Sequence, residues 1–82
     1  MHLEIDLETD LNGQDDDGLG WGLLADARHP ERIVVGRMVL AGNSEAIAVV
    51  RVVAIDEDGQ VHFTILPGPV TKNRHLLDHT AV

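Results

Sequence analysis

The amino-acid sequence predicts a mainly β protein, either a small antiparallel meander or a small barrel, with four to five strands and one or two short helices. Residues 2–8 alternate between polar and apolar side chains, which is the pattern of a strand with one buried face. Residues 46–55 are apolar at nine of ten positions and rich in β-branched side chains. Residues 61–65 alternate again, shortly after the turn-forming pair Asp58-Gly59. Strand patterns this closely spaced favour an all-β fold.

A chain of 82 residues is expected to form a single domain, residues 1–82. Its first 18 residues predict an acidic strand and loop. In the strand, which covers residues 2–8, the apolar side chains share one face, and Glu4, Asp6 and Glu8 form a row of carboxylates in water on the other. The turn pair Asn12-Gly13 and the aspartates after it predict the loop. Residues 19–82 are expected to form the β core with a short C-terminal helix.

The first half of this core is expected to combine one short helix with strands. The segment from Trp21 to Ala27 carries apolar residues at helical spacing. The pair His29-Pro30 would end that helix, because the residue before a proline is displaced from the helical region. Residues 33–35 and 37–41 have the composition of strands, and Gly36 between them predicts a bend or a bulge.

The second half centres on a hairpin from Ile47 to Leu66. Its first strand is apolar enough to be covered on both faces, which is typical of a central strand. The prolines at 67 and 69 end its second strand. Thr71 is placed to cap a last short helix, and Leu76 and Leu77 are expected to point inward.

The hairpin sequence resembles that of a known barrel type. The run Val49-Val50-Arg51-Val52-Val53, the turn Asp58-Gly59 and the strand sequence that ends at Pro67-Gly68 look like the central hairpin of SH3-like small barrels. The resemblance implies an architecture and carries no catalytic or binding residue with it. Peptide-binding SH3 domains hold proline-rich segments with clustered aromatics, whereas Trp21 and Phe63 are the only aromatics here besides histidine. Binding of proline-rich peptides is therefore not expected.

The composition excludes several classes of protein. The chain has no cysteine, which excludes disulfides, thiol nucleophiles and cysteine-bound zinc or iron–sulfur centres. No apolar run approaches the roughly 20 residues of a membrane span. The first residues are acidic where a signal peptide is basic, so we expect a cytoplasmic protein without membrane contact.

The negative charge is concentrated at one end of the chain. Residues 1–18 hold seven acidic residues and no lysine or arginine, and the net charge of the chain is −8 at pH 7. Proteins that bind nucleic acid normally present a basic surface, so nucleic acid is not an expected partner. A basic protein partner would suit the acidic segment. The alternative is that the segment only keeps a small apolar domain dissolved.

Two motifs suggest metal ions, and neither is complete. His75-Leu76-Leu77-Asp78-His79 resembles the H-x-x-E-H motif of inverted zinc peptidases, with aspartate in place of glutamate. A catalytic zinc needs a third protein ligand, and this pair lies near a chain end, so the alternatives are zinc or nickel binding without catalysis and ordinary surface histidines. The aspartates at 15–17 supply ligands for calcium, but their spacing does not fit the calcium-loop pattern. We therefore expect neither a metal nor another cofactor.

No arrangement of residues indicates catalysis. His62 and Thr64 share one face of a strand, and His29 lies near Asp26 and Glu31 in the sequence. Alternate strand residues lie roughly 6.6 to 7 Å apart, which is too far for a preformed base and nucleophile. Nucleophile elbows, phosphate loops and dinucleotide-binding turns are absent from the sequence. We expect a protein that is not an enzyme.

Two residues stand out as candidates for specific roles. Arg51 interrupts an apolar strand, and if buried it must pair with a carboxylate from Glu45, Asp56 or the Glu4 and Asp6 row. Alternatively, it reaches solvent along its stem. Trp21 is either part of the core beneath a glycine-rich hinge or an exposed contact for a partner.

These observations lead to two functional hypotheses. The first is a non-catalytic protein–protein interaction domain that forms a homodimer, because residues 47–55 carry more apolar surface than so short a chain can cover. The second is an acidic inhibitor or antidote that binds a basic site on another protein through residues 1–18. The candidate partner-binding residues are Glu4, Asp6, Glu8, Trp21, Val49, Arg51 and Val53.

Overall fold

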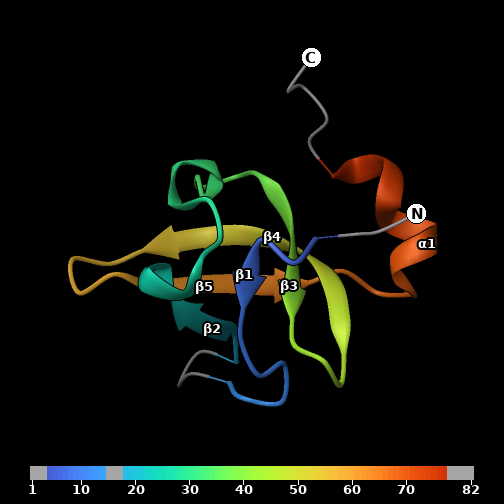
Figure 1. Ribbon diagram of the computed structural model, residues 1–82, viewed down its shortest axis with the longest axis horizontal. Coiled ribbons are helices and arrows are strands. Elements are labelled where there is room, and N and C mark those ends of the chain that lie inside the picture. Colours follow the sequence, from blue (N-terminus) through green and yellow to red (C-terminus); the bar gives the residue numbers. More distant parts are fainter. Residues whose placement is uncertain (1–3, 15–17, 78–82) are drawn as a thin grey trace.

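The computed structural model describes residues 4–14 and 18–77. Within these ranges the protein is mainly β, with one mixed sheet of five strands in the order β1-β3-β4-β5-β2. The strands are β1 (Leu7–Glu8), β2 (Gly20–Leu23), β3 (Met38–Gly42), β4 (Ile47–Ile55) and β5 (Gln60–Ile65). The sheet curls until its two outer strands meet, which gives a nearly closed small barrel (Figure 1). The predicted fold class is confirmed.

The central part of the sheet is an antiparallel meander of β3, β4 and β5, and β2 adds to β5 in the antiparallel direction. Strand β1 instead runs parallel to β3, so that Leu7 pairs with Ala41. The chain crosses from β1 to β2 on the far edge of the sheet before it enters the meander. This crossover brings the two ends of the sheet together.

Two glycines close turns in the same way. Gly36 has a φ of 91°, donates its N–H to the Val52 carbonyl at 2.8 Å, and precedes Arg37, whose carbonyl accepts the Val52 N–H at 3.0 Å. This is a G1 bulge, and it confirms the bulge predicted at Gly36. Gly59 has a φ of 82° and donates to the Asp56 carbonyl at 3.0 Å, while Asp56 donates to Gln60. The predicted hairpin turn at Asp58-Gly59 is also confirmed, as a three-residue loop with a bulge.

The core fills the barrel interior. Phe63, Leu7 and Val50 are fully buried there, and full burial of such a side chain stabilises the fold by about 1.5–3 kcal/mol. Gly20 of β2 lies against the Phe63 ring, and a Cβ at this position would collide with that ring. The absence of a side chain at Gly20 therefore allows Phe63, the largest fully buried side chain among the described residues, to fit under β2.

Strand β4 is covered on both faces for part of its length. Val50 and Val52 face the core, whereas Val49 lies on the opposite face and is nevertheless 1% exposed. The short helix α1 (Val70–Asn73) packs against β4, and the 3-10 turn η3 (Arg74–Leu76) continues it. Farther along β4 the cover ends, since Val53 is 40% exposed.

The segment from Trp21 to Ala27 is not the predicted helix. Residues 20–23 form β2, and Leu24–Asp26 form a single 3-10 turn, η1. The helical spacing of apolar residues was misleading because Gly20 and Gly22 let this strand lie close to its neighbours, so pairing with β5 prevails over local propensity. The predicted glycine-rich hinge is part of this strand.

Four other local predictions need correction. Residues 33–35 are not a strand: they follow the 3-10 turn η2 (Pro30–Arg32) and lead into the Gly36 turn. Thr71 lies inside α1, whose N-cap is Pro69, and Leu76 is 39% exposed instead of pointing inward. Strand β1 has only two residues among those described, Leu7 and Glu8, because a parallel partner is present only over this short overlap.

No helix in the described part of the chain is long and apolar enough to cross a membrane.

Candidate functional site

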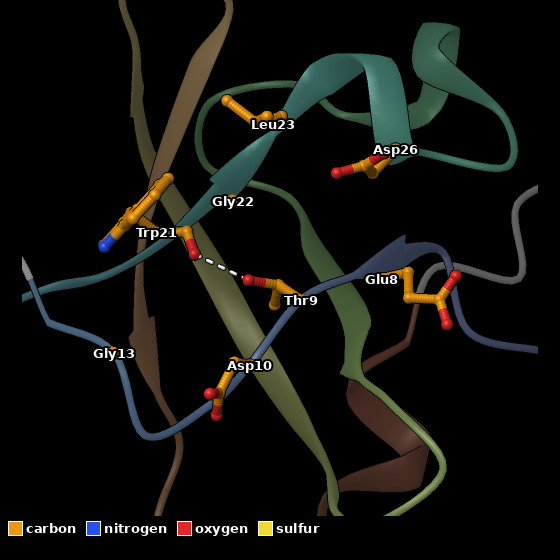
Figure 2. Close-up of a pocket in the computed structure, with 8 residues that line it drawn as sticks. All are labelled: Glu8, Thr9, Asp10, Gly13, Trp21, Gly22, Leu23 and Asp26. Carbon is orange, nitrogen blue, oxygen red and sulfur yellow. Dashed lines mark hydrogen bonds between the residues drawn. The ribbon is translucent and has the colours of Figure 1, made fainter.

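The candidate site lies at the seam where β1 and β2 close the barrel. The seam is joined by few contacts: Leu7 and Ala27 form an isolated bridge, and the Arg28 N–H donates to the Asp6 carbonyl at 2.9 Å. Farther along, the Thr9 hydroxyl donates to the Trp21 carbonyl at 2.7 Å, as Figure 2 shows. Because a side chain replaces the backbone ladder here, the strands separate and leave a surface hollow.

This hollow, which we call the acidic hollow, has a volume of about 330 Å³. Figure 2 shows β1 and the following turn on one side of it and β2 with η1 on the other. Three acidic residues, Glu8, Asp10 and Asp26, line it, and no lysine or arginine is among the described residues that do so. The lining residues are Glu8, Thr9, Asp10, Gly13, Trp21, Gly22, Leu23 and Asp26.

The alternation of β2 directs its side chains to opposite faces. Gly20 and Gly22 point into the barrel and are buried, whereas Trp21 is half-buried and Leu23 is 44% exposed. A Cβ on Gly22 would lie 3.1 Å from the Thr9 hydroxyl oxygen, so this glycine allows Thr9 to reach the Trp21 carbonyl. The small inward residues hold the seam together and the large outward ones form the wall of the hollow.

Trp21 is a half-buried residue that lines the acidic hollow. Its ladder partner on β5 is His62, and its Nε1 lies 3.6 Å from the position that a Cβ on Gly13 would occupy. The ring therefore sits between the barrel wall and the turn after β1. A tryptophan ring beside carboxylates attracts cations, because its face carries partial negative charge.

A second, apolar hollow adjoins the first. It has a volume of about 480 Å³ and shares Leu23 with the acidic hollow. Its lining is mostly aliphatic and lies where η1 meets the β4–β5 turn, at Leu23, Leu24, Ala25, Pro30, Asp58 and Gly59. The Leu24 N–H donates to the Gly59 carbonyl at 2.7 Å, which fixes this side of the hollow to the turn.

The β4–β5 turn beside the apolar hollow is held by Asp56. Its carboxylate accepts the Gln60 N–H at 3.0 Å and the Asp58 N–H at 3.1 Å, and it lies 3.3 Å from His62 Nε2. The hydrogen bond from Gln60, followed by that from His62, lowers the pKa of Asp56 below its ordinary value. The turn next to the hollow is therefore tied to a carboxylate that is ionised at neutral pH.

The candidate partner-binding residues are dispersed over the structure. Glu8 and Trp21 line the acidic hollow. Glu4 is exposed outside it, and the Asp6 carboxylate accepts the Leu40 N–H at 3.0 Å, so Asp6 supports the β1–β3 contact.

The three candidates on β4 are also outside the hollow. Val49 is buried by its own chain and offers no surface. Arg51 is exposed and in register with Met38 and Thr64. This is the alternative in which its side chain reaches solvent. Val53 is exposed at the irregularity between Val52 and Ala54.

Sequence reasoning did not connect Thr9, Leu23 and Asp26 with the hollow. Thr9 belongs to the segment that was predicted as a loop, and Leu23 and Asp26 belong to the segment that was predicted as a helix. These residues come together only because the barrel closes. A strand assignment for residues 20–23 would have been the one available signal, since it places Trp21 and Leu23 on a common face.

The metal and catalytic motifs find no support in the described residues. His79 and the aspartates 15–17 lie outside them, and within them no group of three metal-ligating side chains gathers. His62 Nε2 lies 3.3 Å from Asp56 Oδ2, and His29 Nδ1 lies 3.7 Å from Glu31 Oε2. Comparison of the chain with protein-family models, with curated proteins and with solved structures finds no match.

Proposed function

We propose that the protein is a small non-catalytic protein–protein interaction domain that binds a basic segment of a partner protein in the acidic hollow. The observation that carries this proposal is the placement of Glu8, Asp10 and Asp26 around an open concavity beside Trp21. A lysine or arginine that enters it would meet carboxylates on both sides of the seam. A cation over a tryptophan ring contributes about 0.5–1 kcal/mol at an exposed site.

The charge of the whole chain supports this proposal. The acidic N-terminal residues include Glu8 and Asp10, which line one side of the hollow. They therefore add to the negative potential that a basic segment meets on approach. This extends the inhibitor or antidote hypothesis by giving the acidic segment a concave site. We also propose that the barrel is of the SH3-like type, supported by the central β4–β5 hairpin, and that the cysteine-free chain acts in the cytoplasm.

The proposal is tested by titrating the protein with a short arginine- and lysine-rich peptide and following the fluorescence of Trp21, the only tryptophan in the chain. The variant Glu8→Gln/Asp10→Asn/Asp26→Asn is expected to lose at least tenfold in affinity, because three charges are removed from the hollow. The control Glu31→Gln/Glu45→Gln/Glu57→Gln removes the same charge from exposed sites elsewhere and should bind nearly as the parent does. Equal losses in both variants would contradict a defined site.

A second candidate function is self-association, favoured by a patch of exposed valines. Val34 is 47%, Val35 57% and Val53 40% exposed, and the Gly36 bulge brings the turn that holds the first two against β4. Covering this patch with a second copy would remove apolar surface from water. Sedimentation at micromolar concentration should give a dimer that Val35→Lys dissociates, and a monomer for the unmodified protein would contradict this function.

A further inference from the structure

We propose that the segment recognised at the seam is extended and bipartite, with a basic side chain in the acidic hollow and an apolar side chain in the neighbouring apolar hollow. The inference rests on the proposed function and specifies its partner. It begins from the fact that Leu23 lines both hollows, so that one ligand crossing Leu23 contacts both.

The backbone of β2 offers an edge to such a segment. Gln60, the ladder partner of Leu23, directs its N–H to the Asp56 carboxylate and its carbonyl to the Asp56 N–H. The Leu23–Gln60 pair is therefore a non-hydrogen-bonded pair, and the N–H and carbonyl of Leu23 point away from β5 toward the seam. The Trp21 carbonyl points the same way, since it accepts the Thr9 hydroxyl there. An extended peptide can pair with an edge of this kind.

The basic position follows from the wall of the acidic hollow. Asp26 of η1 and Glu8 and Asp10 around β1 lie on opposite sides of it, as Figure 2 shows. A guanidinium carries several donors in one plane and also stacks on aromatic rings, so it suits a hollow that is lined by acidic residues and Trp21. Arginine is therefore the expected residue.

The apolar position follows from the second hollow. Leu23, Leu24, Ala25 and Pro30 present aliphatic surface there, and Leu23 is 44% exposed without a ligand. Asp58 lies at this hollow, so an acidic side chain would be repelled and an aliphatic one is preferred. Because both hollows open beside Leu23, both peptide side chains must leave the backbone on the same side. In an extended chain this holds for residues two or four apart.

The test compares four peptides in a serine background, monitored by Trp21 fluorescence. The first has arginine and leucine two residues apart, the second has them three apart, the third lacks the leucine, and the fourth lacks the arginine. The first is expected to bind about tenfold more tightly than the second and the third, a gain typical of burying one leucine. It should also bind at least tenfold more tightly than the fourth, which lacks the charge that the acidic hollow attracts. Leu24→Ser should abolish the gain from leucine and keep the arginine-dependent binding, because Leu24 lines only the apolar hollow. The exposed Leu76, which lines neither hollow, supplies the control Leu76→Ser, which should keep both.

The outcomes separate this inference from the function on which it rests. If the arginine peptide binds equally well with and without leucine, or the three-residue spacing binds as well as the two-residue spacing, the bipartite inference is wrong and the basic-segment function stands. If no arginine-containing peptide binds, both are wrong. A gain from leucine that survives in folded Leu24→Ser, checked by circular dichroism, places the apolar contact elsewhere and overturns the inference.

Discussion

At the scale of single residues, Asp56 shows how one side chain fixes a turn beside the apolar hollow. Its carboxylate joins the backbone of Asp58 and Gln60 to the side chain of His62. A carboxylate that accepts several hydrogen bonds is more stable ionised in the folded protein than in the unfolded chain. The turn is therefore coupled to pH through a group that is far in sequence from the acidic segment.

This coupling gives a prediction for acid stability. The pKa of Asp56 is lowered from 3.8, so its contribution to folding is fully present above that value and is lost as the pH falls through the lower folded-state pKa. Asp56→Asn removes this contribution. Urea unfolding at pH 7 and pH 3 should show a smaller loss of stability on acidification for the variant than for the parent. An identical loss in both would mean that Asp56 does not contribute.

Gly20 is a second residue whose role can be tested. Its missing side chain leaves room for the Phe63 ring, so Gly20→Ala should destabilise the protein by about 1–3 kcal/mol through overpacking. Gly13→Ala is the control, because a Cβ there would make ordinary contacts of 3.6 Å with Asp10 and Trp21. The free energies of unfolding measured in urea compare the two. A loss in Gly13→Ala as large as in Gly20→Ala would contradict the packing argument.

At the scale of elements, the two bulged turns set the curvature of the meander. Each glycine adopts a positive φ and allows one strand to place two residues opposite one on its partner, which increases the local twist. Strands with this added twist curl far enough for β1 and β2 to meet, and the seam with its acidic hollow exists because they meet.

The turn at Gly36 provides a clean measure of backbone strain. A Cβ at Gly36 would have no atom within 4 Å, so any loss in Gly36→Ala comes from the φ of 91° alone. We expect a loss of about 1–2 kcal/mol, the cost of a left-handed conformation for an ordinary residue. Gly36→Asn should lose less, because asparagine tolerates positive φ better. Chemical unfolding of the three proteins tests the order, and an alanine variant as stable as the parent would exclude a strained turn.

At the scale of the whole molecule, the charge distribution matches the position of the hollow. The acidic segment at the start of the chain contributes Glu8 and Asp10 directly to the wall, and the rest of the chain carries a balance of acids and bases close to neutral. Two acidic residues of this segment therefore add negative charge at the hollow.

Salt dependence follows from this distribution. The Debye length falls from about 10 Å at 0.1 M salt to about 3 Å at 1 M, so binding of the arginine-leucine peptide should weaken several-fold over this range. The contribution of the leucine should be retained, because burial of apolar surface is not screened by salt. Titrations at both salt concentrations measure the two contributions. Binding that does not change with salt would contradict an electrostatic role for the hollow.

Much of the sheet could be predicted from the sequence, and its closure could not. The β-branched run and the Asp58-Gly59 turn lie close together in the chain, so local pattern was enough to predict the hairpin and the Gly36 bulge. Trp21 was misassigned because the glycines on both sides of it look like a hinge in sequence, and only contact with Phe63 and Thr9 explains them as strand residues. The candidate site was missed for the same reason, since its two walls come from different strands.

The sequence by itself determined the β class, the central hairpin, the glycine turns and the acidic character of the first residues, because each depends on neighbours within a few positions. The tertiary structure alone decided that β1 lies parallel to β3, that β2 is a strand, and that the two meet at a seam. Those features depend on which distant backbones pair when the sheet curls. Pairing at long range is governed by packing of the shared core, which no local pattern of residues encodes.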